Sequence, residues 1–283
     1  IVDNTFPTPV NCRPFEWGAD IVTHSTTKYM DGHAMALGGA IVDSGNFDWD
    51  AHAEKFPGLT TPDESYHGVI YTQKFGKKAY ITKATAQLMR DMGACQSPQN
   101  AFLTNVGLET LHLRMPQHCA NALTVAKYLK NHPKIAWVSY PGLEGDKYYE
   151  TAQKYMPSGT CGVVSFGVKG GRKAAETFMK HLKLAAIETH VADARTCCLH
   201  PASATHRYMR DYPAVFARFL ERKAEIVEKY GLDAARPQWR ANTVWAGLLI
   251  AVGNRMRTDV SRTFAELEDI WNEYGVFGKM DDE

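Results

Sequence analysis

The sequence predicts an α/β protein, and three observations carry this prediction. Short runs rich in β-branched residues end at polar residues and are joined by compact connections, as in residues 18–43. Apolar residues then recur at helical spacing over residues 100–129. From about residue 131, strand and helix patterns alternate, which is typical of a small α/β domain.

The first part of the chain contains the patterns of three strands. Residues 1–3 resemble the end of an apolar strand, and residues 18–24 and 38–43 predict two further strands separated by a polar turn that contains Lys28. Residues 50–80 contain many turn formers and aromatic residues but little periodicity. We therefore predict a long functional loop or lid in that region.

The helical pattern of residues 100–129 is long enough to predict a helix that links two domains. Pro116 falls inside this pattern, so we expect the helix to bend near it. The elements predicted next are two strands and one helix, at residues 135–140, 162–168 and 173–182.

These patterns divide the chain into three parts. Residues 1–130 form a first domain that includes the linking helix, residues 131–207 form a small α/β domain, and residues 208–283 form a tail. The tail has amphipathic patterns at 213–230 and 258–275, on either side of an apolar run, and is predicted to be helical.

Composition excludes several classes of partner. The 283 residues include 32 Lys and Arg against 31 Asp and Glu, a net charge of +1, which gives no reason to expect nucleic acid or an anionic membrane. The longest apolar run is too short to span a bilayer, and the first residues do not resemble a secretory signal.

The cysteines and histidines indicate a reducing compartment and no metal site. The six cysteines are scattered without CxxC pairs, so we expect a cytoplasmic protein. Cys197 and Cys198 are adjacent, which favours two buried thiols on a strand over a redox pair. The eleven histidines lack HExxH or another metal-binding spacing, and no metal ligand is predicted.

Two polar clusters follow apolar strands and indicate a ligand site. Val2-Asp3-Asn4-Thr5 places a carboxylate at the end of one strand, and Ser25-Thr26-Thr27-Lys28 places hydroxyls and an amine just beyond the next. In open α/β sheets the strand ends border the crevice where ligands bind. We therefore expect the two clusters to face the same site.

The groups in these clusters match the requirements of pyridoxal 5′-phosphate (PLP). PLP needs an amine for its aldehyde, a carboxylate for its pyridine nitrogen and donors for its phosphate. Lys28, Asp3, and Ser25 with Thr27 fit these roles. Each residue also has an ordinary explanation, because lysines are mostly solvated, an aspartate often forms turns and Ser-Thr-Thr often caps a helix. Residue types alone leave both interpretations open.

Longer stretches of sequence favour the PLP interpretation. They are Val2-Asp-Asn-Thr-Phe-Pro-Thr-Pro, Cys12-Arg-Pro-Phe-Glu-Trp-Gly-Ala-Asp-Ile-Val-Thr-His-Ser-Thr-Thr-Lys-Tyr, Asp63-Glu-Ser-Tyr-His-Gly, Gly107-Leu-Glu-Thr-Leu, Arg114-Met, His132-Pro-Lys, Tyr140-Pro-Gly-Leu-Glu and His200-Pro-Ala-Ser-Ala-Thr-His-Arg. Through them, residues 1–207 resemble the Cys/Met-metabolism family of PLP-dependent enzymes, and within it the O-acetylhomoserine sulfhydrylases.

The resemblance implies a fold and a set of site residues. It implies part of the large domain of a PLP-dependent transferase of fold type I, the aspartate-aminotransferase-like fold, followed by the small α/β domain. The helical tail of residues 208–283 diverges from the family. It implies that Lys28 binds the cofactor covalently, that Asp3 pairs with the pyridinium, and that Ser25 and Thr27 bind the phosphate. Thr196 falls where relatives keep a Ser or Thr that faces the substrate.

The resemblance also implies a reaction, a transfer in methionine and cysteine biosynthesis. O-acetyl-L-homoserine and sulfide, or a small thiol, would give L-homocysteine and acetate in a homotetramer built as a dimer of dimers. The alternatives are a C–S lyase of the same family, such as methionine γ-lyase or cystathionine γ-lyase, and a catalytically inactive fragment.

Two departures from the family pattern support the last alternative. Relatives carry, before the strand of Asp3, a glycine-containing phosphate loop, an aromatic residue that stacks on the pyridine ring, and a Tyr-x-Arg that reaches the neighbouring subunit's phosphate. No counterpart occurs before Ile1. Relatives also follow the His-Pro-Ala-Ser motif with Ile-Arg-Leu-Ser-Val-Gly-Ile-Glu, whose Arg clamps the substrate carboxylate, and this string does not occur after Arg207.

Overall fold

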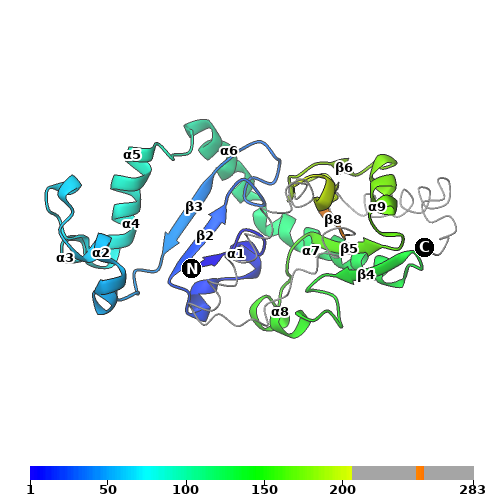
Figure 1. Cartoon of the computed structure of the whole chain (residues 1–283), viewed down its shortest axis with the longest axis horizontal. Coiled ribbons are helices and arrows are strands. Elements are labelled where there is room, and N and C mark those ends of the chain that lie inside the picture. Colours follow the sequence, from blue (N-terminus) through cyan, green and yellow to red (C-terminus); the bar gives the residue numbers. More distant parts are fainter. Residues whose placement is uncertain (206–246, 252–283) are drawn as a thin grey trace, which may run out of the picture. The chain divides into compact units, whose positions relative to one another are not determined.

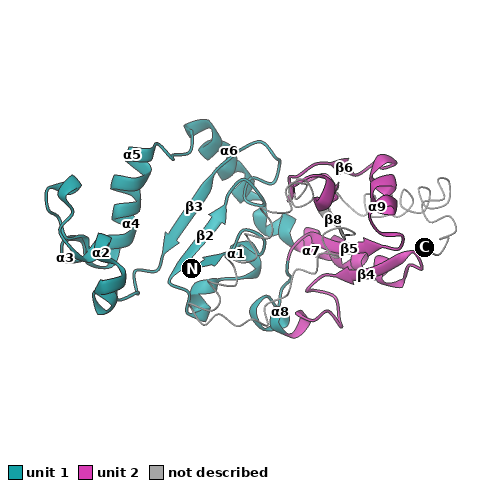
Figure 2. Cartoon of the chain, viewed as in Figure 1, with its two compact units in different colours: residues 1–115, 151–160 teal, residues 116–150, 161–283 magenta. Residues whose placement is uncertain are grey.

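The computed structural model describes residues 1–205 and 247–251, which form the α/β fold expected from the sequence (Figure 1). The chain divides into two compact units, coloured separately in Figure 2. Unit 1 comprises residues 1–115 and 151–160, and unit 2 comprises 116–150 and 161–283. Helix α7 (Leu111–Asn131) contributes to both units, so this division does not test the boundaries expected at residues 130 and 207, which stay predictions.

The sheet of unit 1 contains the three strands that the sequence predicted, and their order is β1-β2-β3. These are β1 (Val2–Asp3), β2 (Ile21–Ser25) and β3 (Gly39–Asp43). Strand β1 runs parallel to β2, whereas β3 runs antiparallel to β2. Two parallel strands bring their carboxyl ends to one edge of a sheet, so β1 and β2 both end at the edge that carries the polar clusters.

The prediction of a long loop or lid at residues 50–80 is wrong, because this segment consists of short helices around an aromatic cluster. The cluster contains Trp49, Leu59 and Tyr71, and Trp49 stacks on Tyr80 with ring centroids 5.4 Å apart. Aromatic rings bury large areas without a helical repeat, which explains the weak periodicity. The helices around this cluster are α2 (Pro57–Thr60), α3 (Tyr71–Phe75), α4 (Ala79–Lys83) and the 3-10 helices Asp50–Lys55, Glu64–Tyr66 and Gly76–Lys78.

The remaining helical segments of unit 1 are short, apart from the first half of the predicted linking helix. A π-helical turn (Ala84–Met89) continues α4 into α5 (Arg90–Met92). Pro98 begins α6 after Ser97, whose side chain caps the helix by accepting a hydrogen bond from the Asn100 N–H. The others are α1 (Thr8–Asn11), the 3-10 helix Pro14–Trp17 and α6 (Pro98–Glu109).

The long helical pattern forms two helices, and the break lies at Thr110 instead of near Pro116. Helix α6 ends at Glu109 and α7 begins at Leu111, with Pro116 inside α7. At the break, the carbonyl of Gly107 accepts hydrogen bonds from the Thr110 N–H and from the Arg114 side chain. The break thus coincides with a hydrogen bond from the Arg114 side chain, which a helical repeat cannot show.

Unit 2 contains a five-stranded sheet in the order β4-β5-β8-β7-β6. The pairs β4–β5, β5–β8 and β8–β7 are antiparallel, and β7–β6 is parallel. The predicted strands and helix near residues 135, 163 and 173 are confirmed. The elements are β4 (Ile135–Ser139), α8 (Tyr149–Tyr155, shared with unit 1), β5 (Val163–Val168), α9 (Gly171–Lys180), β6 (Ala186–Ile187), β7 (Cys197–Leu199), the 3-10 helix Pro201–Ser203 and β8 (Gly247–Ala251).

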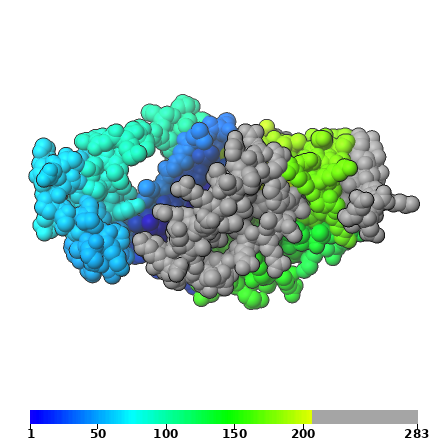
Figure 3. Space-filling model, in the orientation of Figure 1, coloured from blue at the N-terminus to red at the C-terminus, as the bar shows by residue number. Residues whose placement is uncertain are grey.

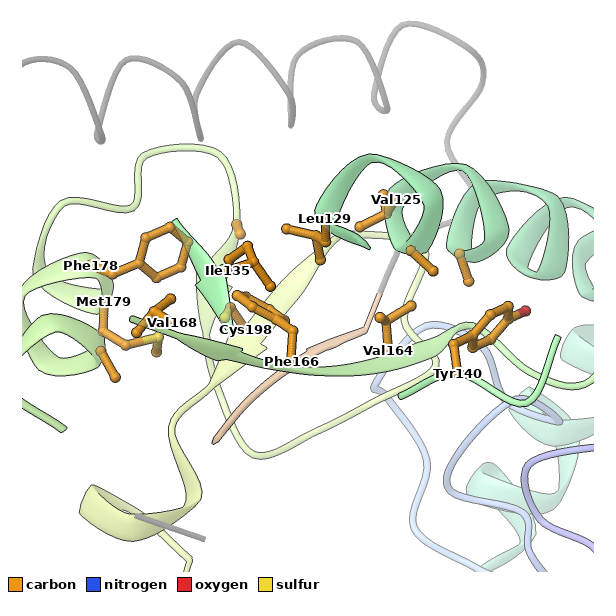
Figure 4. Packing of buried hydrophobic residues seen from close by; sticks show 14 of the residues in the cluster. Val125, Leu129, Ile135, Tyr140, Val164, Phe166, Val168, Phe178, Met179 and Cys198 are labelled. Carbon is orange, nitrogen blue, oxygen red and sulfur yellow. The ribbon is translucent and has the colours of Figure 1, made fainter. Parts of the chain in front are cut away.

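The core of unit 2 lies between this sheet and the helices α7 and α9 (Figure 4). Alternate residues of β5, namely Val164, Phe166 and Val168, point into it, as the two-residue repeat of a strand requires. The rings of Phe166 and Phe178 meet edge to face, with centroids 6.2 Å apart.

The predicted helical tail is wrong for residues 247–251, which form strand β8 between β5 and β7. An apolar run of this length suits a buried strand as well as a buried helix, so periodicity could not separate the two. The rest of residues 208–283 lies outside the described residues. Among the described helices, none combines the length and apolar character needed to cross a membrane.

The packing of Phe178 gives a stability prediction. Its side chain is 0% exposed, so Phe178→Ala should lower the free energy of unfolding of unit 2 by about 3–5 kcal/mol. Denaturant titration measures the change. The control Ile187→Ala removes a side chain that is 60% exposed and should change the free energy little. Equal losses in both variants would contradict this description of the core.

Candidate active site

Asp3 is the last residue of β1 and Ser25 is the last residue of β2, and these parallel strands end at the same edge of the sheet. In the register of this pair, Asp3 lies opposite Thr23, and the N–H of Asn4 donates to the Thr23 carbonyl at 2.9 Å. Ser25 is the last residue of β2, and Lys28 follows three residues later. The structure thus brings together the strand ends from which both predicted clusters extend.

The side chain of Thr5 joins these two strand ends directly. Its Oγ1 donates to Oδ1 of Asp3 at 2.5 Å and accepts from the N–H of Ser25 at 2.8 Å. The N–H of Thr5 donates to the same carboxylate oxygen at 3.0 Å. Hydrogen bonds to a charged acceptor are the stronger ones in proteins, so Thr5 fixes the orientation of the Asp3 carboxylate.

Lys28 lies in a series of tight turns that follows β2. Its N–H donates to the Ser25 carbonyl at 3.2 Å, and its carbonyl accepts from the N–H of Gly32 at 2.8 Å. The N–H of Asp31 donates to the Thr26 carbonyl at 3.0 Å. These bonds fix the backbone on both sides of Lys28, whose side chain is half-buried.

The hydroxyls next to Lys28 have different surroundings. Thr27 Oγ1 donates to the Gly38 carbonyl and accepts from the Gly38 N–H, at 3.2 and 3.1 Å. The hydroxyl of Ser25 makes no hydrogen bond to another described residue, and that of Thr26 is buried without a partner among them. A phosphate ligand could use Ser25 as it stands, whereas Thr27 would have to give up its bond to Gly38.

His24 is a site residue that the sequence interpretation missed. It is buried on β2, and its Nδ1 has no hydrogen-bond partner among the described residues. Burial lowers the pKa of His24, while the charge of Asp3 and a hydrogen bond with the Asn4 backbone oppose this effect. The electrostatic interaction places a titratable ring near the Asp3 carboxylate. In the sequence, His24 could be recognised only as a polar residue within a strand pattern.

Thr5 and Arg114 were also missed as individual residues, although both stand in the stretches that resemble the family. The sequence contained one signal for Thr5: an aspartate side chain often forms a turn by hydrogen bonding to the residue two positions later, and Thr5 is two positions after Asp3. Arg114 donates to the Tyr29 carbonyl, next to Lys28, and nothing in its local sequence indicates this partner.

Thr196 lies in unit 2, directly before β7, and is 3% exposed. Its carbonyl accepts a hydrogen bond from the N–H of Ala186. Its role toward the substrate stays a prediction. The neighbouring Cys197 and Cys198 are buried thiols on β7 that form no disulfide, as expected from the sequence.

A cavity of about 1100 Å³ lies in unit 1 between β3 and the helical run of residues 79–92 (Figure 3). Its lining is mainly apolar and includes Ile41 and Leu88, with His24 on its wall. Neither Asp3 nor Lys28 is among the residues that line it. Within the described part of the chain, no three His, Cys, Asp or Glu side chains are grouped to hold a metal ion.

The model of the family described as Cys/Met metabolism PLP-dependent enzymes matches residues 1–214. This chain belongs to that family. Among its relatives, homocysteine synthase of Schizosaccharomyces pombe is 45% identical over 218 residues, which cover 77% of this chain and 51% of the relative. O-acetyl-L-homoserine sulfhydrylase of Leptospira meyeri is also 45% identical over 218 residues, covering 74% of this chain and 49% of the relative. The chain thus spans about half the length of these curated relatives.

A solved structure supports the same relationship at the level of the fold. It comes from Campylobacter jejuni, is assigned as an O-acetylhomoserine (thiol)-lyase, and carries N′-pyridoxyl-lysine-5′-monophosphate. The two structures superpose with a TM-score of 0.76 at 29% sequence identity, over 95% of this chain and 58% of the other. The fold is that of the PLP-dependent transferases of fold type I, as the sequence predicted.

The residues at the ends of β1 and β2 fit the cofactor of this family. Oδ1 of Asp3 is held by Thr5, while Oδ2 accepts no hydrogen bond from a described residue and can face a pyridinium nitrogen. The unbonded Ser25 hydroxyl suits a phosphate oxygen. The Asp3 carboxylate and the Ser25 hydroxyl are therefore chemically complementary to the pyridinium nitrogen and the phosphate of PLP.

The bridge formed by Thr5 gives the second prediction. Thr5→Val keeps the shape of the side chain but removes the hydroxyl, and should lower the free energy of unfolding by about 1.5–3 kcal/mol because a charge-assisted bond is lost and the Ser25 N–H loses its acceptor. Thr5→Ser keeps the hydroxyl and should lose less. Denaturant titration compares the two, and equal losses would show that the hydroxyl bridge contributes nothing.

Proposed function

We propose that this chain is part of a PLP-dependent transferase that replaces the γ-substituent of an amino acid. O-acetyl-L-homoserine and sulfide, or a small thiol, would give L-homocysteine (or the corresponding thioether) and acetate. The names of the similar proteins support this reaction class. The observation that carries the proposal is the Thr5 hydroxyl, which links the Asp3 carboxylate to the start of the turn that carries Lys28.

We assign each residue a role in this reaction. Lys28 holds the cofactor covalently, Asp3 keeps its pyridine nitrogen protonated, and Ser25 and Thr27 bind its phosphate. Bound PLP supplies an electron sink for negative charge at the substrate's α-carbon. Thr196 contacts the substrate.

The chemistry of the chain's own residues follows from these positions. The amine of Lys28 would move protons at the α- and β-carbons of the substrate. Acetate then leaves from the γ-carbon, and the sulfur nucleophile forms its bond there. The Asp3 carboxylate is held in place by Thr5.

We further propose that the parent protein is a homotetramer, a dimer of dimers, that acts in the cytoplasm in methionine and cysteine biosynthesis. All six cysteines lie in the described residues and none forms a disulfide, which supports a reducing compartment. The first domain would extend over residues 1–130, and the small domain over 131–207.

Covalent attachment of the cofactor at Lys28 is the third prediction. The chain incubated with PLP should develop the visible absorbance band of lysine-bound PLP, and Lys28→Ala should abolish it because no other lysine lies between β2 and β3. Borohydride reduction followed by peptide mass spectrometry should find the pyridoxyl group on Lys28. The control Lys78→Ala replaces an exposed lysine of the same unit and should keep the band. A pyridoxyl group on another lysine would contradict the assignment, and no band in any form would indicate an inactive fragment.

Product analysis tests the reaction class. With O-acetylhomoserine and sulfide, the proposal expects homocysteine and acetate in equal amounts. Release of methanethiol from methionine alone, without γ-replacement, would identify a lyase of the same family instead.

A further inference from the structure

The turn that carries Lys28 touches α6 without any side chain of that helix in between. A β-carbon built on Gly107 would lie 2.2 Å from the carbonyl oxygen of Met30 and 2.5 Å from that of Asp31. These are backbone atoms, so they cannot rotate away as a side chain could. Glycine is therefore required at position 107 for the turn to approach the helix this closely.

Arg114 extends over the same contact from the start of α7. Its side chain is 8% exposed and makes a hydrogen bond from each of its three nitrogens. Nη1 donates to the Tyr29 carbonyl at 2.8 Å, Nη2 to the Gly107 carbonyl at 2.7 Å, and Nε to Oγ1 of Thr110 at 3.0 Å. One planar guanidinium thus ties the turn to the helix, with a geometry that a lysine cannot reproduce.

Two further residues show that the guanidinium is built into the turn. A β-carbon on Gly32 would lie 2.3 Å from Nη1 of Arg114, and Gly32 has a φ of +71°. Asp31 is 0% exposed, interacts electrostatically with Arg114, and accepts hydrogen bonds from the N–H groups of His33 and Met35 through Oδ2. The buried cation therefore has a buried carboxylate in the turn as its counter-charge.

We propose that Arg114 is a positioning residue for Lys28: it holds the Tyr29 carbonyl and thereby the backbone from which the lysine side chain projects. The proposal deepens the assigned function, since it takes Lys28 as the cofactor lysine. Tyr29 directly follows Lys28, and the carbonyl of Lys28 is bonded to Gly32, beside the guanidinium. Without Arg114, both restraints on this side of Lys28 would loosen together.

Hydrogen exchange tests the proposal without any cofactor, and it is the fourth prediction. Arg114→Met removes all three donors, and amide exchange in residues 26–38 should become roughly tenfold faster or more, because the charge-assisted bond to the Tyr29 carbonyl is lost together with the cation that faces Asp31. Arg114→Lys should give a smaller increase. Exchange in β2 and in the aromatic segment of residues 47–80 should stay unchanged. The control Arg90→Met replaces an exposed arginine of the same unit and should leave residues 26–38 protected.

The outcomes separate a positioning role from a general structural one. The proposal would be overturned if exchange became faster across the whole of unit 1. It would also be overturned if the exchange rate of residues 26–38 did not change. If Arg114→Met does not fold, Arg114→Lys and Gly32→Ala are used in its place. The methyl group added by Gly32→Ala would displace the guanidinium of Arg114. The effects of Arg114→Lys and Gly32→Ala on exchange should be less than additive in the double variant, because both substitutions disturb the same contact. Full additivity would count against the proposal.

A second readout connects the turn to the chemistry. The pH at the midpoint of the titration of the lysine-bound PLP band should shift in Arg114→Lys and not in Arg90→Met. If wild-type protein shows no such band while the exchange results are as expected, the proposed function fails and the role of Arg114 in the turn stands. If the band forms but neither exchange nor its pH midpoint responds to Arg114, the positioning role fails and the proposed function stands.

Discussion

One hydroxyl group, that of Thr5, determines how the ends of β1 and β2 meet. Strand β1 contains only two residues, so few backbone hydrogen bonds hold it to β2. The side chain of Thr5 adds a bond to the Ser25 N–H beyond the last backbone pair and orients the Asp3 carboxylate at the same time. The position of the acid and the path of the chain into the turn of Lys28 are therefore one geometric constraint.

A second constraint acts on the other side of Lys28 and has a different origin. Thr5 is close in sequence to Asp3, whereas Arg114 and Gly107 reach the turn from the helices α6 and α7. The first constraint uses hydrogen bonding to a charged group, and the second combines a buried cation with a contact that only glycine permits. Together they hold the backbone before and after the lysine.

The sequence was informative where a general rule connects residue type to position. Asp3 and Lys28 follow apolar strands, and the rule that ligands bind at strand ends was enough to predict that the ends of β1 and β2 meet. Arg114 binds backbone carbonyls, which every residue has, so its partner could not be identified from residue types. The aromatic segment and strand β8 were missed because aromatic packing has no repeat and a short apolar run suits either kind of element.

The contact between Arg114 and Tyr29 also bears on how the protein acquires its order. It joins residues separated by 85 positions, so it is a non-local contact whose formation carries a loop-closure entropy cost. The β2 strand can pair with β3 locally, but the turn between them stays incompletely restrained until α6 arrives. The native surroundings of Lys28 therefore depend on a tertiary contact and are not formed by the β2–β3 hairpin alone.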